Sequence, residues 1–130
     1  MTKLLLLLCV FSMSICGAAD FSENSLKDEM VKMQKILETN TIENAKLFID
    51  TYCDPADLAK ISESGKTVEQ VYAQFVERAK GERMRKCMKE TESLVGVISG
   101  DDKTITYKVE SGVRGQIKFK FIDGKWYLVN

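Results

Sequence analysis

The fold is decided by the stretch Phe119-Lys-Phe-Ile-Asp-Gly-Lys-Trp-Tyr-Leu-Val129, which reads as two strands around a tight turn. Asp123 and Gly124 both tolerate the positive φ that a two-residue hairpin turn requires. A turn there pairs Phe121 with Trp126, and alternation then assigns every side chain to one of two faces. One face holds Ile117, Phe119, Phe121, Trp126 and Leu128, and the other holds Lys118, Lys120, Lys125 and Tyr127. We therefore predict a hairpin with one aromatic, buried face and one basic, solvated face.

Two further strand patterns precede this hairpin. The segment over 94–99 is short, apolar and rich in β-branched residues, and the segment over 105–109 alternates between apolar and polar side chains. Glycine and aspartate at 100–102, and glycines between 111 and 115, supply the turns. We predict a four-stranded antiparallel meander.

Helical periodicity dominates the chain between residue 25 and this meander. Apolar residues recur at spacings of three and four over 26–39, 42–53 and 68–80. A short helical turn is expected after Asp54-Pro55, through Leu58 and Ile61, and a further piece can begin at Glu82. The prediction is an α+β fold in which three N-terminal helical segments pack on a curved four-stranded antiparallel meander.

The first 19 residues have the pattern of a secretory signal peptide. Lys3 precedes an apolar run over 4–15, which is shorter than the ~20 residues that span a bilayer, and small residues follow at 17–19. We predict cleavage after Ala19, a single domain over 20–130, and a periplasmic or extracellular location. An uncleaved membrane anchor and a lipoprotein attached through Cys16 are the alternatives. No second apolar segment has spanning length, so no transmembrane span is expected in the mature chain.

Two cysteines, Cys53 and Cys87, remain after such cleavage. In an oxidising compartment an even pair is typical of a disulfide, which is our prediction. Two buried free thiols are the alternative. A metal site is a poorer interpretation, because two thiolates without histidine leave the coordination shell incomplete.

Composition excludes several chemistries. The chain has no histidine, so it cannot form the usual Ser-His-Asp or Cys-His systems, and it carries no recognisable catalytic or phosphate-binding motif. Its formal net charge is zero, so the chain lacks the positive electrostatic field that is typical of nucleic-acid-binding proteins. We expect no cofactor, no metal, no nucleic-acid partner and no enzymatic activity.

The order of these elements resembles the nuclear transport factor 2-like superfamily, an α+β cone of the cystatin-like kind. The residues that carry the resemblance are the terminal hairpin over 119–130 and the stretch from Ile42 to Tyr52 with Asp54-Pro55 and Leu58. The ending is similar to that of small secreted bacterial members. The resemblance implies a pocket between the helices and the concave sheet face. It also implies aspartate and histidine in the pockets of enzymatic members, and this chain has no histidine to supply.

An aromatic set is the candidate lining of such a pocket, and its alternative interpretation is the core of a small domain. The set comprises Tyr52, Tyr72, Phe75, Tyr107, Phe119, Phe121 and Trp126. The three tyrosines are the candidate polar handles, because a buried hydroxyl needs a partner.

The sequence thus predicts an exported, noncatalytic domain that binds a small ligand or a protein partner in or beside an aromatic-lined cone. One alternative is an envelope interaction protein without a ligand, including a homodimer through the outer sheet face. Another is a cofactor-free acid–base enzyme that uses a carboxylate and a tyrosine.

Overall fold

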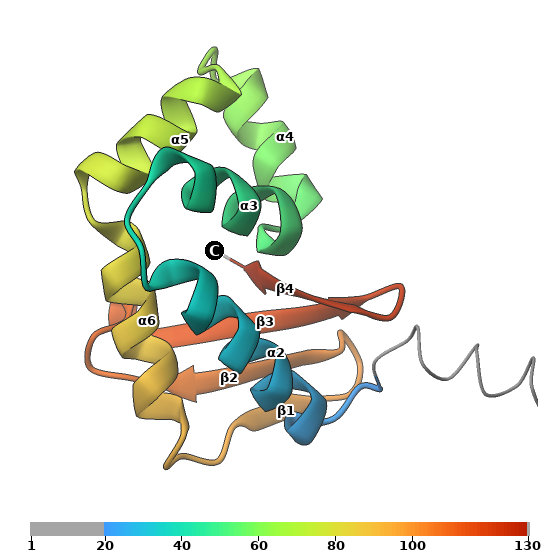
Figure 1. Cartoon of the computed structure of the whole chain (residues 1–130). Helices are drawn as coiled ribbons and strands as arrows, with labels where there is room; N and C mark the ends of the chain where they lie inside the picture. Colours follow the sequence, from blue (N-terminus) through green and yellow to red (C-terminus); the bar gives the residue numbers. More distant parts are fainter. Residues whose placement is uncertain (1–19, 130) are drawn as a thin grey trace, which may run out of the picture.

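The computed structural model describes residues 20–129, in which five helices precede four strands (Figure 1). The helices are α2 (Glu23–Leu37), α3 (Ile42–Tyr52), α4 (Pro55–Glu63), α5 (Val68–Glu77) and α6 (Lys80–Thr91). The predicted α+β class is confirmed, whereas the predicted number of three helical segments was too small. The predicted signal peptide and Cys16 lie outside the described residues.

Local capping explains where the helices begin. Ser22 is the N-cap of α2 and accepts a hydrogen bond from the Ser25 amide, so this helix begins three residues earlier than predicted. Thr67 and Gln70 form a capping box at the start of α5. Asp54 caps α4, and its neighbour Pro55 occupies the first helical turn.

The predicted helix over 68–80 is interrupted between α5 and α6. Ala79 has φ +49°, a left-handed conformation that ends the helical path of α5. Close packing follows at Gly81, where an added Cβ would lie 3.1 Å from side-chain atoms of both Leu37 and Phe75. The glycine therefore allows α6 to approach α2 and α5 closely.

The sheet has the strand order β1-β2-β3-β4 and is antiparallel throughout. Its strands are β1 (Val97–Ser99), β2 (Thr104–Lys108), β3 (Gln116–Ile122) and β4 (Lys125–Val129). The predicted register of the last hairpin is confirmed, because Phe121 pairs with Trp126 and Ile122 pairs with Lys125. Asp123 and Gly124 have φ values of +49° and +77°, as such a turn requires.

Both edges of the sheet are partly covered by other parts of the chain. At β4, the Asp54 amide donates to the Leu128 carbonyl oxygen at 3.3 Å, so the link between α3 and α4 lies along this strand. Beside β1, the Gly96 amide donates to the Glu23 carboxylate at 2.7 Å. Edge backbone groups that find such partners are less available to foreign strands.

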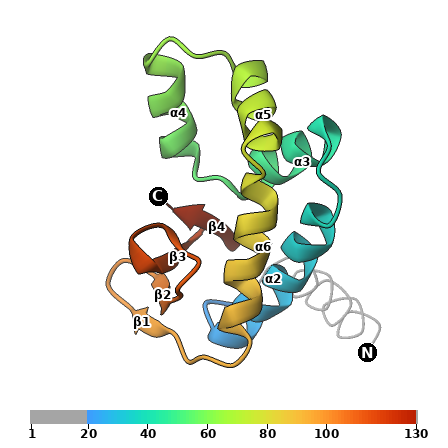
Figure 2. The ribbon, with the colours of Figure 1, turned by 90° about the vertical axis from the view of Figure 1, so that its left-hand side faces the viewer.

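The core lies between the helices and one face of the sheet. Figure 2 shows α2 and α6 on the same side of the strands, with α3 and α5 continuing the helical layer away from the sheet. The side chains with less than 2% exposure come from helices and strands alike: Leu26, Met33, Phe48, Met88, Thr91, Ile105, Tyr107 and Phe119. The predicted burial of the aromatic sheet face beneath helices is what the structure shows.

The structure contradicts the predicted disulfide, because Cys53 and Cys87 are both free thiols. Cys53 follows α3 and its backbone forms an isolated parallel β-bridge with Leu128, whereas Cys87 is buried on α6. α3 packs on α2, α5 and β4, whereas α6 packs on α2 and α5, so the two cysteines belong to parts of the chain that do not pack closely on each other. Bridged cysteines need Cα atoms within roughly 7 Å of each other. Cysteine count alone carried the prediction, and the packing of α6 overrides it.

Within residues 20–129, no helix combines the length and the apolar character that crossing a bilayer requires.

Candidate functional site

The aromatic residues predicted to line a pocket lie mainly in the core. Six of the seven are buried and Phe121 is half-buried. The buried six are Tyr52, Tyr72, Phe75, Tyr107, Phe119 and Trp126. Within the set, Phe121 and Trp126 pack on each other and on Phe21, which lies 5.7 Å from Trp126 and 5.9 Å from Phe121 between ring centroids. Tyr52 and Phe75 both pack on Phe48. What these residues can offer a ligand therefore depends on their polar atoms.

The hydroxyl group of Tyr107 is already engaged by the chain itself. It donates to the Glu23 carboxylate at 2.7 Å, and the same oxygen accepts from the Gly96 amide. These contacts hold the pKa of Glu23 below its ordinary value, chiefly through the Tyr107 hydrogen bond. Desolvation and the neighbouring carboxylate raise the pKa of Tyr107. This tyrosine therefore stays protonated and acts as a structural donor at neutral pH.

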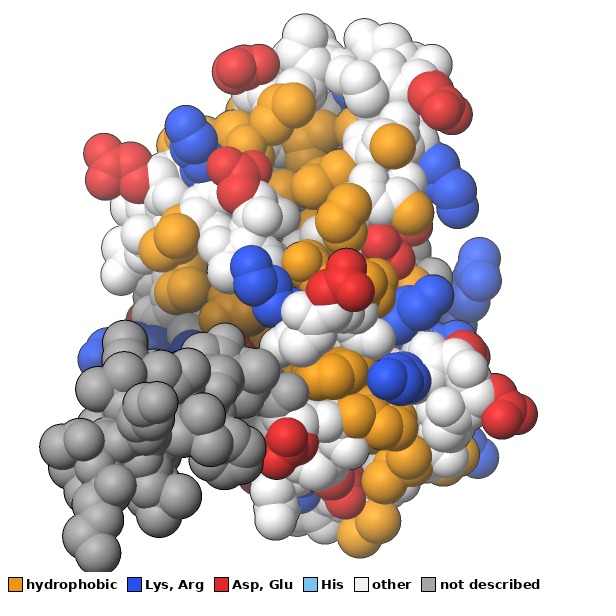
Figure 3. All heavy atoms as spheres, turned by 90° about the vertical axis from the view of Figure 1, so that its right-hand side faces the viewer, with side chains coloured by type: hydrophobic (Ala, Val, Ile, Leu, Met, Phe, Trp, Pro, Cys, Tyr) orange, Lys and Arg blue, Asp and Glu red, His pale blue; other side chains and the backbone are white. Residues whose placement is uncertain are grey.

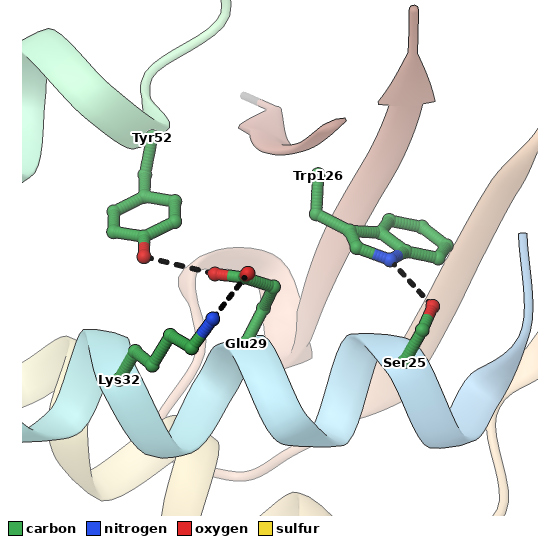
Figure 4. Close-up of polar contacts among 5 residues, drawn as sticks. All are labelled: Ser25, Glu29, Lys32, Tyr52 and Trp126. Atoms are coloured by element: carbon green, nitrogen blue, oxygen red, sulfur yellow. Dashed lines mark hydrogen bonds and ion pairs between the residues drawn. The ribbon is translucent and has the colours of Figure 1, made fainter. Parts of the chain in front are cut away.

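Two more aromatic tips are held by the same helix, α2 (Figure 4). The Trp126 indole N–H donates to Ser25 Oγ at 2.9 Å, and the Tyr52 hydroxyl donates to Glu29 Oε2 at 2.9 Å. Lys32 pairs with the other oxygen of Glu29 at 3.1 Å. Ser25 and Glu29 are one turn apart, so one edge of α2 satisfies both rings.

Tyr72 is the third tyrosine of the predicted set, and it also lines the groove described below. Its hydroxyl donates to Asp50 Oδ1 on α3. Burial and this hydrogen bond raise the pKa of Tyr72 to about 12. The three tyrosines predicted as polar handles thus all have carboxylate partners within the chain.

An apolar groove lies between α3, α4 and α5, with a volume of about 270 Å³. We call it the α4 groove. Its lining residues are Ile49, Asp50, Leu58, Ile61, Ser62, Lys66, Val68, Val71 and Tyr72. In Figure 3, hydrophobic side chains gather around a hollow in the upper half of the molecule, where α3 and α4 face the viewer. The volume is close to the lower end of small-molecule sites, which span about 300–1,000 Å³.

The groove exists because α4 does not pack closely on its neighbours. None of the residues of α4 is fully buried, although Leu58 and Ile61 form an apolar pair three residues apart. The helix is attached at its beginning through Asp54, which bonds to Leu128, and at its end through the turn over 64–67. Its apolar side therefore faces a space that the chain does not fill.

Of the predicted pocket residues, only Tyr72 lines this groove. The spacing of Leu58 and Ile61 predicted a helical turn but did not indicate that these two side chains form a wall of a groove. The available signal was an apolar pair on a short helix directly before the apolar face of α5.

Metal chemistry finds no support in the described part of the chain, where no three cysteine or acidic side chains gather as a metal would require. Burial raises the pKa of Cys53 to about 11 and also raises that of Cys87, so both thiols are protonated at neutral pH.

Comparison with known proteins yields no match: no family model, no curated protein and no solved structure is similar enough to the chain to count as one.

Proposed function

We propose that this protein is an exported, noncatalytic domain of the nuclear transport factor 2-like kind that binds a small apolar ligand in the α4 groove. The observation that carries the proposal is an open cavity of about 270 Å³ with five aliphatic side chains in its lining. The predicted aromatic set supports the fold instead, because the hydrogen-bonding groups of its three tyrosines and of Trp126 bind α2 and α3. The ligand would thus lie beside these aromatic residues and not among them.

Export is proposed on the pattern of residues 1–19, with a periplasmic or extracellular location. The superfamily is proposed on the element order and the terminal hairpin.

The alternatives have less support. An acid–base enzyme would need a tyrosine or carboxylate whose pKa lies near neutrality. The pKa values of Tyr52, Tyr72 and Tyr107 are instead raised further from it. An interaction protein without a ligand, or a homodimer through the outer sheet face, would not account for the α4 groove. That outer face also carries Lys118, Lys120 and Lys125, which disfavour a dry contact between two copies.

Titration with 1-octanol, monitored by methyl NMR, tests the proposal. We expect shifts at groove methyl groups such as those of Ile61 and Val71, and none at Ile105 in the sheet core. Shifts spread evenly over the core, or no shifts at all, would contradict it.

A matched pair of variants makes this test specific. Ile61→Asp places a charge in the groove wall, so octanol binding should be lost. Ala59→Asp places the same charge on the exposed side of the same helix, so binding should persist. Because α4 buries no residue, both variants should keep the circular dichroism of the parent protein.

A further inference from the structure

We propose that the ligand of the α4 groove is an aliphatic molecule with one positively charged head group, of the alkylamine class. This inference rests on the proposed function and names the chemical class of its ligand. It follows from the shape of the groove and from the charges around it.

The walls of the groove select an aliphatic body. Ile49 and Val71 contribute branched side chains from α3 and α5, and Leu58 faces them from α4. The groove is small and bounded by the turn over 64–67, which suits a short chain and not an extended polymer. Burying a methylene group of such a chain contributes about 0.8 kcal/mol.

Asp50 is the group in the lining that would bind a cation. One of its oxygens accepts from the Tyr72 hydroxyl, which holds the carboxylate at the wall of the groove. The ion pairs found within residues 20–129 are Lys32–Glu29 and Lys86–Glu82, so Asp50 has no cationic partner there. A charged head group of a ligand would supply one.

Lys66 is the cationic side chain in the lining of the groove, but its ammonium group hydrogen-bonds to another residue and does not pair with Asp50. Its Nζ donates to Gln74 Oε1 on α5 at 3.4 Å, and the residue is exposed. A lysine in that position can cover the apolar body of a ligand with its aliphatic stem while its ammonium group stays in water.

The surrounding helices strengthen the preference for a cation. Residues 40–77, which form α3, α4 and α5, contain seven acidic and three basic side chains, a net charge of −4. The same field acts on the Cys53 thiol at the junction of α3 and α4. Burial raises the pKa of that thiol most, and Asp57, Asp50 and Asp54 raise it further against Lys80.

Three ligands with the same eight-carbon chain test the inference at pH 7: octylammonium, 1-octanol and octanoate. We expect octylammonium to bind most tightly and octanoate most weakly, measured by calorimetry or methyl NMR at low salt. Asp50→Asn should weaken octylammonium binding about two- to fivefold, as expected for an exposed ion pair, and so reduce the preference for octylammonium over octanol. The asparagine oxygen can still accept from Tyr72, so the wall should keep its shape.

Glu92→Gln is the matched control, because it removes one negative charge at the exposed end of α6, far along the chain from the groove. It should leave octylammonium binding unchanged. The preference for the cation should also shrink as salt is added.

The outcomes separate the two proposals. If none of the three ligands binds, the proposed function fails. If octanol binds but octanoate binds as tightly as octylammonium, the proposed function stands and this inference is overturned. A preference for octylammonium that Asp50→Asn leaves unchanged would also overturn it.

Discussion

A single hydroxyl group, on Tyr107, joins the first described helix to the second strand of the sheet. The tyrosine is 1% exposed, and its partner Glu23 precedes it by 84 residues. Tyr107→Phe keeps the ring and removes the donor, so we expect a loss of about 1 kcal/mol in the free energy of unfolding. Tyr127→Phe, on the outer sheet face, should change stability by less than about 0.5 kcal/mol. Urea unfolding measures both, and equal effects would contradict the role of this hydrogen bond.

Glu23 makes the same contact sensitive to pH. Its pKa is lower in the folded chain than the ordinary value of 4.5, first because of Tyr107 and also because of Gly96 and Lys27. Folding therefore favours the ionised carboxylate, and its contribution to stability is complete above pH 4.5 and is lost as the pH falls through the folded value.

Glu23→Gln should consequently reduce the loss of stability between pH 7 and pH 3. Glu90 and Asp102, whose pKa values are also lowered, should leave part of the loss in place. Glu92→Gln, at the exposed end of α6, serves as the control, and the change on Glu23→Gln should exceed the change that it produces. Superimposable profiles for the parent and Glu23→Gln would count against the assignment.

At the scale of elements, Gly96 determines how β1 joins the sheet. A Cβ at this position would lie 2.5 Å from Ile105 Cγ2 and 3.0 Å from the Tyr107 ring, and both neighbours are buried. Gly96→Ala should therefore cost about 1–3 kcal/mol through overpacking. Gly100→Ala, in the turn that follows β1, meets no atom within 4 Å and should have little effect. Thermal unfolding of the two variants makes the comparison, and similar midpoints would show that β1 can shift away.

Elements with local causes were predictable, and those with tertiary causes were not. The turn at Asp123 and Gly124, with the alternation beside it, determines the register of the last hairpin, so the structure agrees with that prediction. A further helical piece was expected from Glu82, but the position of the break at Ala79 has no local signal, because alanine favours helix and here adopts a positive φ.

The candidate site shows the same limit. The apolar spacing of Leu58 and Ile61 was visible in the sequence, but a short amphipathic helix can either pack against its neighbour or stand apart from it. That choice depends on the attachment of Asp54 to Leu128, a contact between distant parts of the chain. The aromatic residues were predicted to line a pocket because large rings are typical both of cores and of pockets.

At the scale of the whole molecule, contacts distant in sequence tie the two ends of the chain together. Trp126 donates to Ser25 across 101 residues, and Phe21 packs on the same indole. In the middle of the chain, α3 contacts α2 and β4, and α5 contacts α6. The helices above the sheet are therefore joined to it through both α2 and α6.

This connectivity predicts one cooperative unfolding transition. Trp126 is the only tryptophan in the chain and lies where α2 meets the sheet, so its fluorescence reports that junction. Far-ultraviolet circular dichroism reports mainly the five helices described, and α3, α4 and α5 lie above the sheet in Figure 1. We expect both signals to change at the same urea concentration, because single domains under 150 residues usually unfold in one step. If helical signal persisted after the tryptophan had become exposed, α3, α4 and α5 would form a unit that is stable without the sheet, and the cohesion inferred from these contacts would be wrong.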